Sequence, residues 1–493
     1  MADNRLIPRR HSLPLLLLAS ASFLGCVQRW TRPEGDGGWD SPRRQEELAQ
    51  RAAAAGVEFP TPGVTAQSAP TARVPLDLRS ALALALRGNR RIAEAQEQLA
   101  IGAESVADAR GRLLPGSIAS GRYTWATDAQ GNRFPAGLPL PAGAPQVIKI
   151  RDAEYGTLNA TVTLPLDLSG ELRHALAAAQ AGYRGDKARL WATTLDQQTQ
   201  VVRAYFQLLQ AQRLREVTMQ TLALDRQQVD NAEARFRNGR VTKNDLLIAQ
   251  VALRNAEQRL VQRDLAIDQA RWSLNQLLGL EVNAPTEVVD VEEAPELPQV
   301  GEALHTAYEH NPLLQALLQE QQRLDESEAA LVSSRLPRFS AGGAGDYSTS
   351  DLLQPQQIGS AFAAFTWDLG TDTRREAQIA QARSAIQENR LVIEGQMRQL
   401  EESVRSTHRA AMERLSALSA AREAVGQAEE NLRIRQQQFD AGRAQSDDVL
   451  RAEAVLAQQR ATLASALYQA HTRRAELQQL VGVALEDLLD SQR

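Results

Sequence analysis

The sequence predicts a mainly helical protein with a membrane β-barrel portion, built from two tandem structural repeats. Three features predict this class: long windows without proline, matching residues in the two halves, and short segments of alternating polar and apolar residues. All 20 prolines avoid residues 166–284 and 356–493. Because proline costs about 3 kcal/mol inside a helix, each window is expected to hold very long helices.

Composition supports long helices and argues against a nucleic-acid partner. Aromatic residues make up only 4% of the 493 residues, and chains rich in Ala, Leu, Gln, Glu and Arg are typical of coiled coils. The net charge of −5 comes from 55 basic and 60 acidic residues. No basic face is visible, so no nucleic acid is expected as a partner.

The N-terminus has the pattern of an export signal, expected over residues 1–25. Basic residues precede an apolar run that ends at Cys26, the single cysteine. The run looks like a bacterial lipobox, although Phe23 and Leu24 depart from its usual residues. We expect Cys26 to be acylated and residues 26–74 to form a tether, the alternative being cleavage nearby without acylation, for instance after Ala21. Further along the chain, no apolar run is long enough for a membrane helix.

Two copies of one unit follow the tether. Asn89 and Pro115 match Asn311 and Pro337 at one common offset. Further matches are Asp167 with Asp368, Phe236 with Phe439, Gly239 with Gly442, Asp245 with Asp448, and Gly279 with Gly482. We therefore divide the chain into a first repeat over 75–282, a linker over 283–300, a second repeat over 301–483 and a tail over 484–493. A Pro/Gly-rich stretch, 129–137, lies where the first copy is longer, and it is expected to be a loop tip.

Each proline-free window is expected to contain one helix hairpin. The helices are predicted over 171–237 and 244–278, and over 371–440 and 446–481, and the longer ones would span roughly 100 Å. A sustained heptad on the shorter helices predicts coiled-coil packing. Its positions are Leu246, Leu253, Leu260, Ile267 and Leu274, with Ala249, Ala256, Ala270 and Leu277 three places on, and Val449, Leu456, Leu463, Ala470 and Leu477 in the second copy.

Four segments of about ten residues alternate between polar and apolar side chains, the pattern of transmembrane strands. They are expected at about 117–127, 155–167, 338–349 and 358–368. An open sheet edge is not tolerated in lipid, and four strands cannot close a barrel. Chains must therefore pool their strands: two would give eight strands, and three would give twelve.

The order and spacing of these segments resemble those of a known family. The second copy runs Trp367-Asp368-Leu369-Gly370 and later Phe439-Asp440-Ala441-Gly442. Over about residues 75–485 the chain resembles the TolC-like outer-membrane efflux proteins. The resemblance implies a homotrimer with a twelve-stranded barrel in the outer-membrane lipid and a helical α-barrel extending into the periplasm. It also implies an exit duct for efflux or secretion, docked to a periplasmic adaptor and to an inner-membrane pump, either ABC-type or proton-driven.

The turns between the paired helices are the first candidate site. Gly239 and Gly442 are expected to be left-handed residues that end their helices, and Asn244 and Ser446 to cap the helices that follow. The resemblance adds a role in docking the adaptor at these tips. The residues concerned are Phe236, Gly239, Arg240, Phe439, Gly442 and Arg443.

Acids directly after the turns are the second candidate site. Asp245, Asp447 and Asp448 are suited to the first turn of a helix, where they complement the helix dipole. The resemblance instead places Asp448 in an acidic ring at a closed periplasmic entrance that favours cations. A second acid one turn later belongs to that ring in the best-known family member, but Arg451 stands there in this chain. Both roles remain open at this point.

No catalytic, cofactor or metal site is expected. The 6 histidines, 4 methionines and single cysteine show no metal-ligand spacing, and no phosphate-binding glycine loop is visible. The alternative to a channel is a lipid-anchored periplasmic coiled-coil scaffold without a pore. The alternating strands favour the channel, because a scaffold has no use for them. The sequence leaves the transported substrate and the class of pump open.

Overall fold

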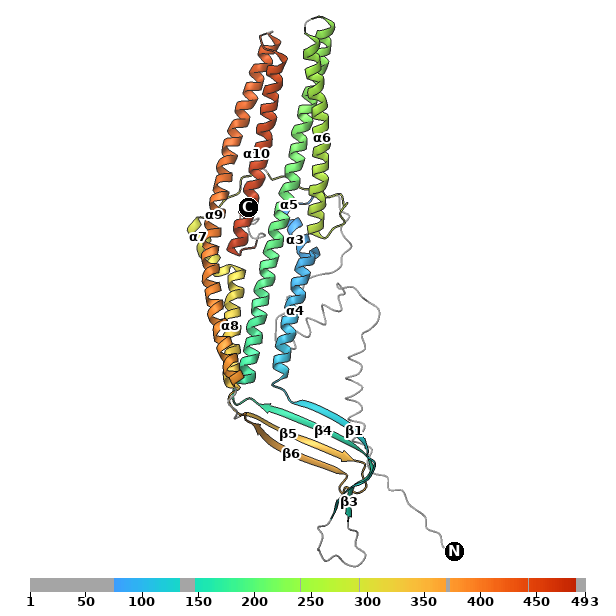
Figure 1. Cartoon of the computed structure of the whole chain (residues 1–493). Helices are drawn as coiled ribbons and strands as arrows, with labels where there is room; N and C mark the ends of the chain where they lie inside the picture. Colours follow the sequence, from blue (N-terminus) through green and yellow to red (C-terminus); the bar gives the residue numbers. More distant parts are fainter. Residues whose placement is uncertain are drawn as a thin grey trace, which may run out of the picture.

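The computed structural model describes residues 75–133, 147–239, 241–291, 293–368, 373–441 and 443–484. The expected signal peptide, the tether with Cys26 and the tail beyond residue 484 lie outside these ranges. The molecule is elongated and mostly helical, with two long helix pairs at one end and an antiparallel sheet at the other (Figure 1). No helix in the described ranges is both long enough and apolar enough to span a membrane.

Each repeat contributes two short helices and one long hairpin. The first repeat has α3 (Leu78–Gly88), α4 (Arg90–Gly111), α5 (Glu171–Arg237) and α6 (Lys243–Leu278). The second has α7 (Val300–His310), α8 (Pro312–Ser333), α9 (Thr373–Asp440) and α10 (Ser446–Val481). With 67 residues in α5 and 68 in α9, each spans roughly 100 Å. The predicted long helices are confirmed, and their ends match closely.

The heptad on α6 and α10 is the packing seam of the hairpins. None of the heptad positions that the sequence singled out is exposed, and Ala249, Ala256 and Leu274 on α6 are fully covered. On α10, Val449 and Leu456 pack against Ala428 and Leu432 of α9. Small alanines in this seam let the paired helices approach closely.

A four-stranded antiparallel sheet lies at the far end of the helices. Its strands are β1 (Gly116–Trp125), β4 (Glu154–Leu166), β5 (Arg338–Ser348) and β6 (Gln357–Thr366), in the order β1-β4-β5-β6. The register is regular: Leu158 lies opposite Gly121 on β1 and Tyr347 on β5. In the described chain, β1 and β6 have no strand on their outer sides.

This register gathers most of the apolar side chains on one face, although Ile118, Ile358 and Phe362 lie on the other. Tyr123, Trp125, Leu158, Val162, Leu164, Leu166, Tyr347 and Phe365 share that face, and all are exposed. Aromatic residues stand at both ends of it, Tyr123 and Tyr347 at one and Phe339 and Phe365 at the other. The opposite face carries Thr157, Asn159, Thr161 and Thr163, and the Asn159 amide donates to Asp346 across the strands at 2.5 Å.

A second, two-stranded sheet was not predicted. β2 (Gln130–Arg133) pairs with β3 (Val147–Arg151) beyond the end of the larger sheet. The loop predicted over 129–137 therefore begins as a strand, because its backbone pairs with residues farther along than the glycine-rich stretch. Beside this hairpin, Asp152 accepts hydrogen bonds from the Ser350 hydroxyl at 2.7 Å and the Asp351 N–H at 3.0 Å.

Each repeat has the same kind of joint between its short helices and its long hairpin. Asn89 caps α4 by accepting from the Arg91 N–H at 2.9 Å and donates to the Leu277 carbonyl at 3.2 Å. Asn311 caps α8 in the same way, accepting from the Leu314 N–H at 3.0 Å and donating to the Leu480 carbonyl at 2.9 Å. The matching asparagines of the sequence thus have matching structural roles.

Beside these joints lies the largest buried cluster. Tyr205 and Phe206 of α5 pack with Tyr468 and His471 of α10. The Tyr205 hydroxyl lies 2.6 Å from the Val289 carbonyl oxygen, so this cluster also holds part of the inter-repeat linker.

Candidate functional site: the hairpin ends

The turn between α5 and α6 contains the left-handed glycine that the sequence predicts. Gly239 has φ of +66°, and its N–H donates to the Phe236 carbonyl at 2.9 Å. A β-carbon at Gly239 would meet nothing within 4 Å, so the backbone conformation alone favours glycine there. Arg240 and the matching Gly442 lie outside the described residues.

Asp245 closes a capping box at the start of α6. Its carboxylate accepts from the Thr242 N–H at 2.9 Å and the Thr242 hydroxyl at 2.7 Å, while the Asp245 N–H donates to the same hydroxyl at 3.3 Å. These bonds hold the pKa of Asp245 below its ordinary value, first through the Thr242 side chain and then through its backbone. The predicted cap at Asn244 is wrong: the helix begins one residue earlier, so Thr242 takes the cap position.

The second hairpin repeats this arrangement with different residues. Gln445 is the cap of α10, and its N–H donates to the Asp448 carboxylate at 3.0 Å. The predicted cap at Ser446 is wrong, since Ser446 is the first helical residue. Asp447 pairs with Arg451 at 2.5 Å. Of the two neighbouring acids, Asp448 therefore binds the cap residue and the charge of Asp447 is partly neutralised.

The two matching phenylalanines differ in their surroundings. Phe236 is 41% exposed. Phe439 packs against the α9–α10 cluster, and the Arg235 guanidinium lies 4.2 Å from its ring centroid. Arg443 is exposed. The two hairpin ends therefore differ: the ring of Phe236 is exposed, whereas the ring of Phe439 is covered in part by the neighbouring helices.

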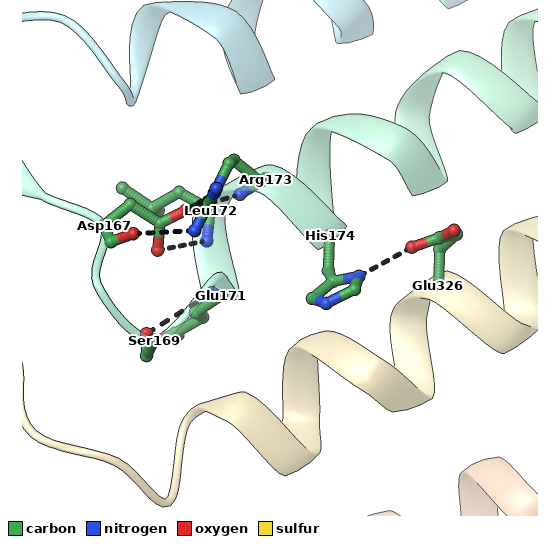
Figure 2. Close-up of polar contacts among 7 residues, drawn as sticks. All are labelled: Asp167, Ser169, Glu171, Leu172, Arg173, His174 and Glu326. Atoms are coloured by element: carbon green, nitrogen blue, oxygen red, sulfur yellow. Dashed lines mark hydrogen bonds and ion pairs between the residues drawn. The ribbon is translucent and has the colours of Figure 1, made fainter.

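Polar contacts fix the helices to the sheet at the other end of α5 (Figure 2). The Asp167 carboxylate accepts from the Leu172 N–H at 3.2 Å and the Arg173 N–H at 3.0 Å. His174 of α5 lies 2.7 Å from Glu326 of α8. In the second repeat Asp368, which matches Asp167, pairs with Arg375 at 3.2 Å. Both matching acids thus bind the first turns of the long helices.

No described group of three or more His, Cys, Asp or Glu residues could hold a metal ion. Two acids that the sequence did not single out, Asp225 of α5 and Glu453 of α10, are buried between the hairpins. The sequence pattern did not predict their burial, because charged residues beside a heptad seam are usually solvated.

The model of one protein family, described as outer membrane efflux protein, matches residues 81–280 and 303–483. The two matched segments together cover more than half of the chain, and each lies within one of the two repeats predicted from the sequence. No curated protein sequence matches the chain.

Solved outer-membrane channels share the fold. The outer membrane protein VceC of Vibrio cholerae is 19% identical, with a TM-score of 0.68, over 82% of this chain and 96% of that one. The CmeC outer membrane channel of Campylobacter jejuni is 14% identical, with a TM-score of 0.70, over 82% and 85%. The open state of the MtrE outer membrane channel of Neisseria gonorrhoeae is 18% identical, with a TM-score of 0.65, over 82% and 88%.

Proposed function

The chain belongs to the outer membrane efflux protein family, and we propose that three copies of it form one exit duct. Members of this family are passive channels rather than enzymes. The proposed trimer holds a twelve-stranded barrel in the outer membrane and a helical barrel in the periplasm. Substrates for efflux or secretion would pass through it without chemical change.

The single observation that carries the proposal is the open sheet with one apolar face. Its exposed apolar side chains fit lipid, and the aromatic residues at both ends fit the two membrane interfaces. The unpaired edges of β1 and β6 would cost several kcal/mol for each backbone group in hydrocarbon. Pairing β1 of one copy with β6 of the next removes both edges.

The opposite end of the molecule is the proposed docking site for an adaptor, which would join the duct to an ABC-type or proton-driven pump. The exposed Phe236 and Arg443 support this role, since an accessible aromatic ring and a guanidinium are common anchors in protein interfaces. Gly239 sets the turn that directly follows Phe236. We also include Arg240, Phe439 and Gly442 among the docking residues, as the resemblance implies.

The acids beside these turns are proposed to line the periplasmic entrance. Threefold symmetry would bring three copies of Asp245, Asp447 and Asp448 together near the axis. The ion pair of Asp447 with Arg451 weakens the field of such a ring, so we propose a moderate preference for cations. At the other extreme of the chain, acylation of Cys26 would add a lipid anchor to the barrel.

A mass measurement in mild detergent, followed by recording in planar bilayers, tests the proposal. We expect a trimer that conducts ions, because only pooled strands close a barrel with a lumen. A monomer that binds membranes through its lipid but does not conduct would contradict the channel and support the scaffold.

A further inference from the structure

Two carboxyl groups are buried between the hairpins near their free ends. Glu453 of α10 and Asp225 of α5 are each only 4% exposed. Both carboxylate oxygens of Glu453 lack a hydrogen-bond partner in the described chain. An ionised carboxylate without a partner in a protein interior is strongly disfavoured, so this side chain requires a ligand or a proton.

No cation in the described part of the chain acts on Glu453. Its neighbours along α10, Val449, Ala452 and Leu456, pack with Ala428 and Leu432 of α9 in an apolar cluster. From α5, the only charge that acts on it is the like charge of Asp225, and the Gln228 amide approaches without full hydrogen-bonding geometry. From α6, Arg259 acts on Asp225 and not on Glu453.

Burial and the like charge act in the same direction. Burial, followed by the charge of Asp225, raises the pKa of Glu453 from 4.5 to about 7. Burial also raises the pKa of Asp225, against the opposing effect of Arg259. Two carboxyls in such a site cannot both ionise at low cost, and the proton remains on the one with the weaker cationic support.

We propose that Glu453 is a proton-binding site that links α10 to α5 and releases this contact when the proton leaves. Glu453 lies five residues beyond Asp448, roughly 8 Å along α10, so the site is next to the hairpin end. The same two helices also meet farther along, where Arg460 donates to Gln220 at 2.7 Å and Arg203 to Glu476 at 2.7 Å. Those contacts keep the hairpins joined while the free ends separate.

The direction of the pH dependence follows from the raised value. Below pH 4.5 the carboxyl is protonated in both the closed and the opened state, so the proton's full contribution is present. As the pH rises to about 7, the closed state keeps a proton that the opened state has lost, and the contact weakens steadily. Above that value the contact stays weak. A consequence for transport rests on the proposed function. In such a duct, separation of these helix ends would widen the periplasmic entrance at neutral to alkaline pH.

Infrared spectroscopy of the full-length protein tests proton binding directly. The carbonyl band of a buried carboxylic acid should be present at pH 5.5, disappear at pH 8.5 and be absent in Glu453→Gln. In Asp225→Asn the band should disappear at lower pH than in the wild type, because the like charge is gone. A spectrum without such a band, or one unchanged in Glu453→Gln, would overturn the proposal.

Hydrogen exchange by mass spectrometry tests the release. After correction for intrinsic exchange, protection of α5 and α10 around the site should fall about thirtyfold between pH 5.5 and 8.5 if opening restores the ordinary pKa. In Glu453→Gln protection should stay high at both values. Glu423→Gln, which changes an exposed acid of α9, should behave as the wild type does. Equal pH dependence in the wild type and Glu453→Gln would overturn the release.

Neither measurement depends on conduction. If the band and the protection change as expected but the protein forms no pore, the proposed function fails and the proton site stands. If the protein conducts and neither readout changes, the proton site fails and the proposed function stands.

Discussion

At the scale of single residues, the acids beside the hairpin turns have a structural task that is independent of any pore. Asp245 and Asp448 each accept a hydrogen bond from the backbone N–H of the residue that caps their helix. Removing Asp448 would therefore disturb α10 whether or not an entrance ring exists. A useful test must separate the charge of the side chain from its role as an acceptor.

Asp448→Lys and Asp448→Asn make that separation. Asparagine retains an acceptor for the Gln445 N–H and removes only the charge, whereas lysine reverses the charge. If the acid lies at the entrance, single-channel reversal potentials under a salt gradient should move away from cation preference in the asparagine variant and further in the lysine variant. Both shifts should grow at low salt, where screening is weak. Equal potentials in all three proteins would mean that Asp448 only binds the cap residue of its helix.

His471 is a second residue whose protonation matters. It stacks on Phe206 at 4.7 Å between ring centroids, and its Nε2 lies 2.8 Å from the Glu293 carbonyl oxygen, to which it donates. Burial lowers its pKa from 6.5 to about 4. The folded protein therefore excludes a proton that the unfolded chain binds, and stability is lost as the pH falls from 6.5 towards 4.

We expect this residue to contribute up to about 3 kcal/mol of acid sensitivity per chain. His471→Gln keeps a donor for the Glu293 carbonyl but cannot titrate in this range. Urea unfolding between pH 4 and 7 should show a smaller loss of stability on acidification in the variant, although the variant is less stable at pH 7 because the stacking is gone. The same pH dependence in both proteins would show that His471 has the same pKa in the folded and unfolded states.

At the scale of elements, the long helices could be predicted well because their evidence is cumulative. Proline is absent from two long windows, and the heptad continues along the shorter helix of each hairpin. The N-caps of α6 and α10 were not predicted correctly. Thr242 and Asn244 are both favoured cap residues two positions apart, and at α10 Gln445 takes the cap position although Ser446 is the better cap residue. The β2–β3 hairpin was missed because its pairing joins segments on either side of a glycine- and proline-rich stretch. The buried acids were missed because only the three-dimensional packing of α5 against α10 shows that they are buried.

The joint between α3 and α6 allows a quantitative prediction about stability. Gly279 has φ of +71°, and a β-carbon there would collide with the Gly88 carbonyl. Gly239 has φ of +66° but open space around it. Alanine at Gly239 should therefore cost only the backbone strain, of the order of 1 kcal/mol, and alanine at Gly279 clearly more.

Thermal unfolding of the two variants measures the difference. Both variants carry the same backbone strain. The additional loss of stability in Gly279→Ala therefore measures the close approach of α3 and α6. If both variants lose the same stability, the two backbones are not in contact at this joint.

At the scale of the whole molecule, one chain combines an end suited to lipid with a body suited to water. The sheet exposes its apolar face, while the long helices bury their seams and expose charged residues such as Arg254 and Arg398. The Asp167 and Asp368 contacts lie where the two parts meet. A coiled-coil scaffold would need only the second part, so the sheet decides between the two functions.

Adjacent residues of β4 provide the matched test, because they point to opposite faces of the sheet. Val162 is 50% exposed on the apolar face, and Thr161 lies on the polar face. If that apolar face meets lipid, Val162→Lys should disfavour folding into vesicles by about 2–4 kcal/mol. Thr161→Lys should cost far less, because its side chain would point into a water-filled lumen. Denaturant titrations of the refolded proteins in vesicles give both values, and equal costs would mean that the two faces of the sheet meet the same environment.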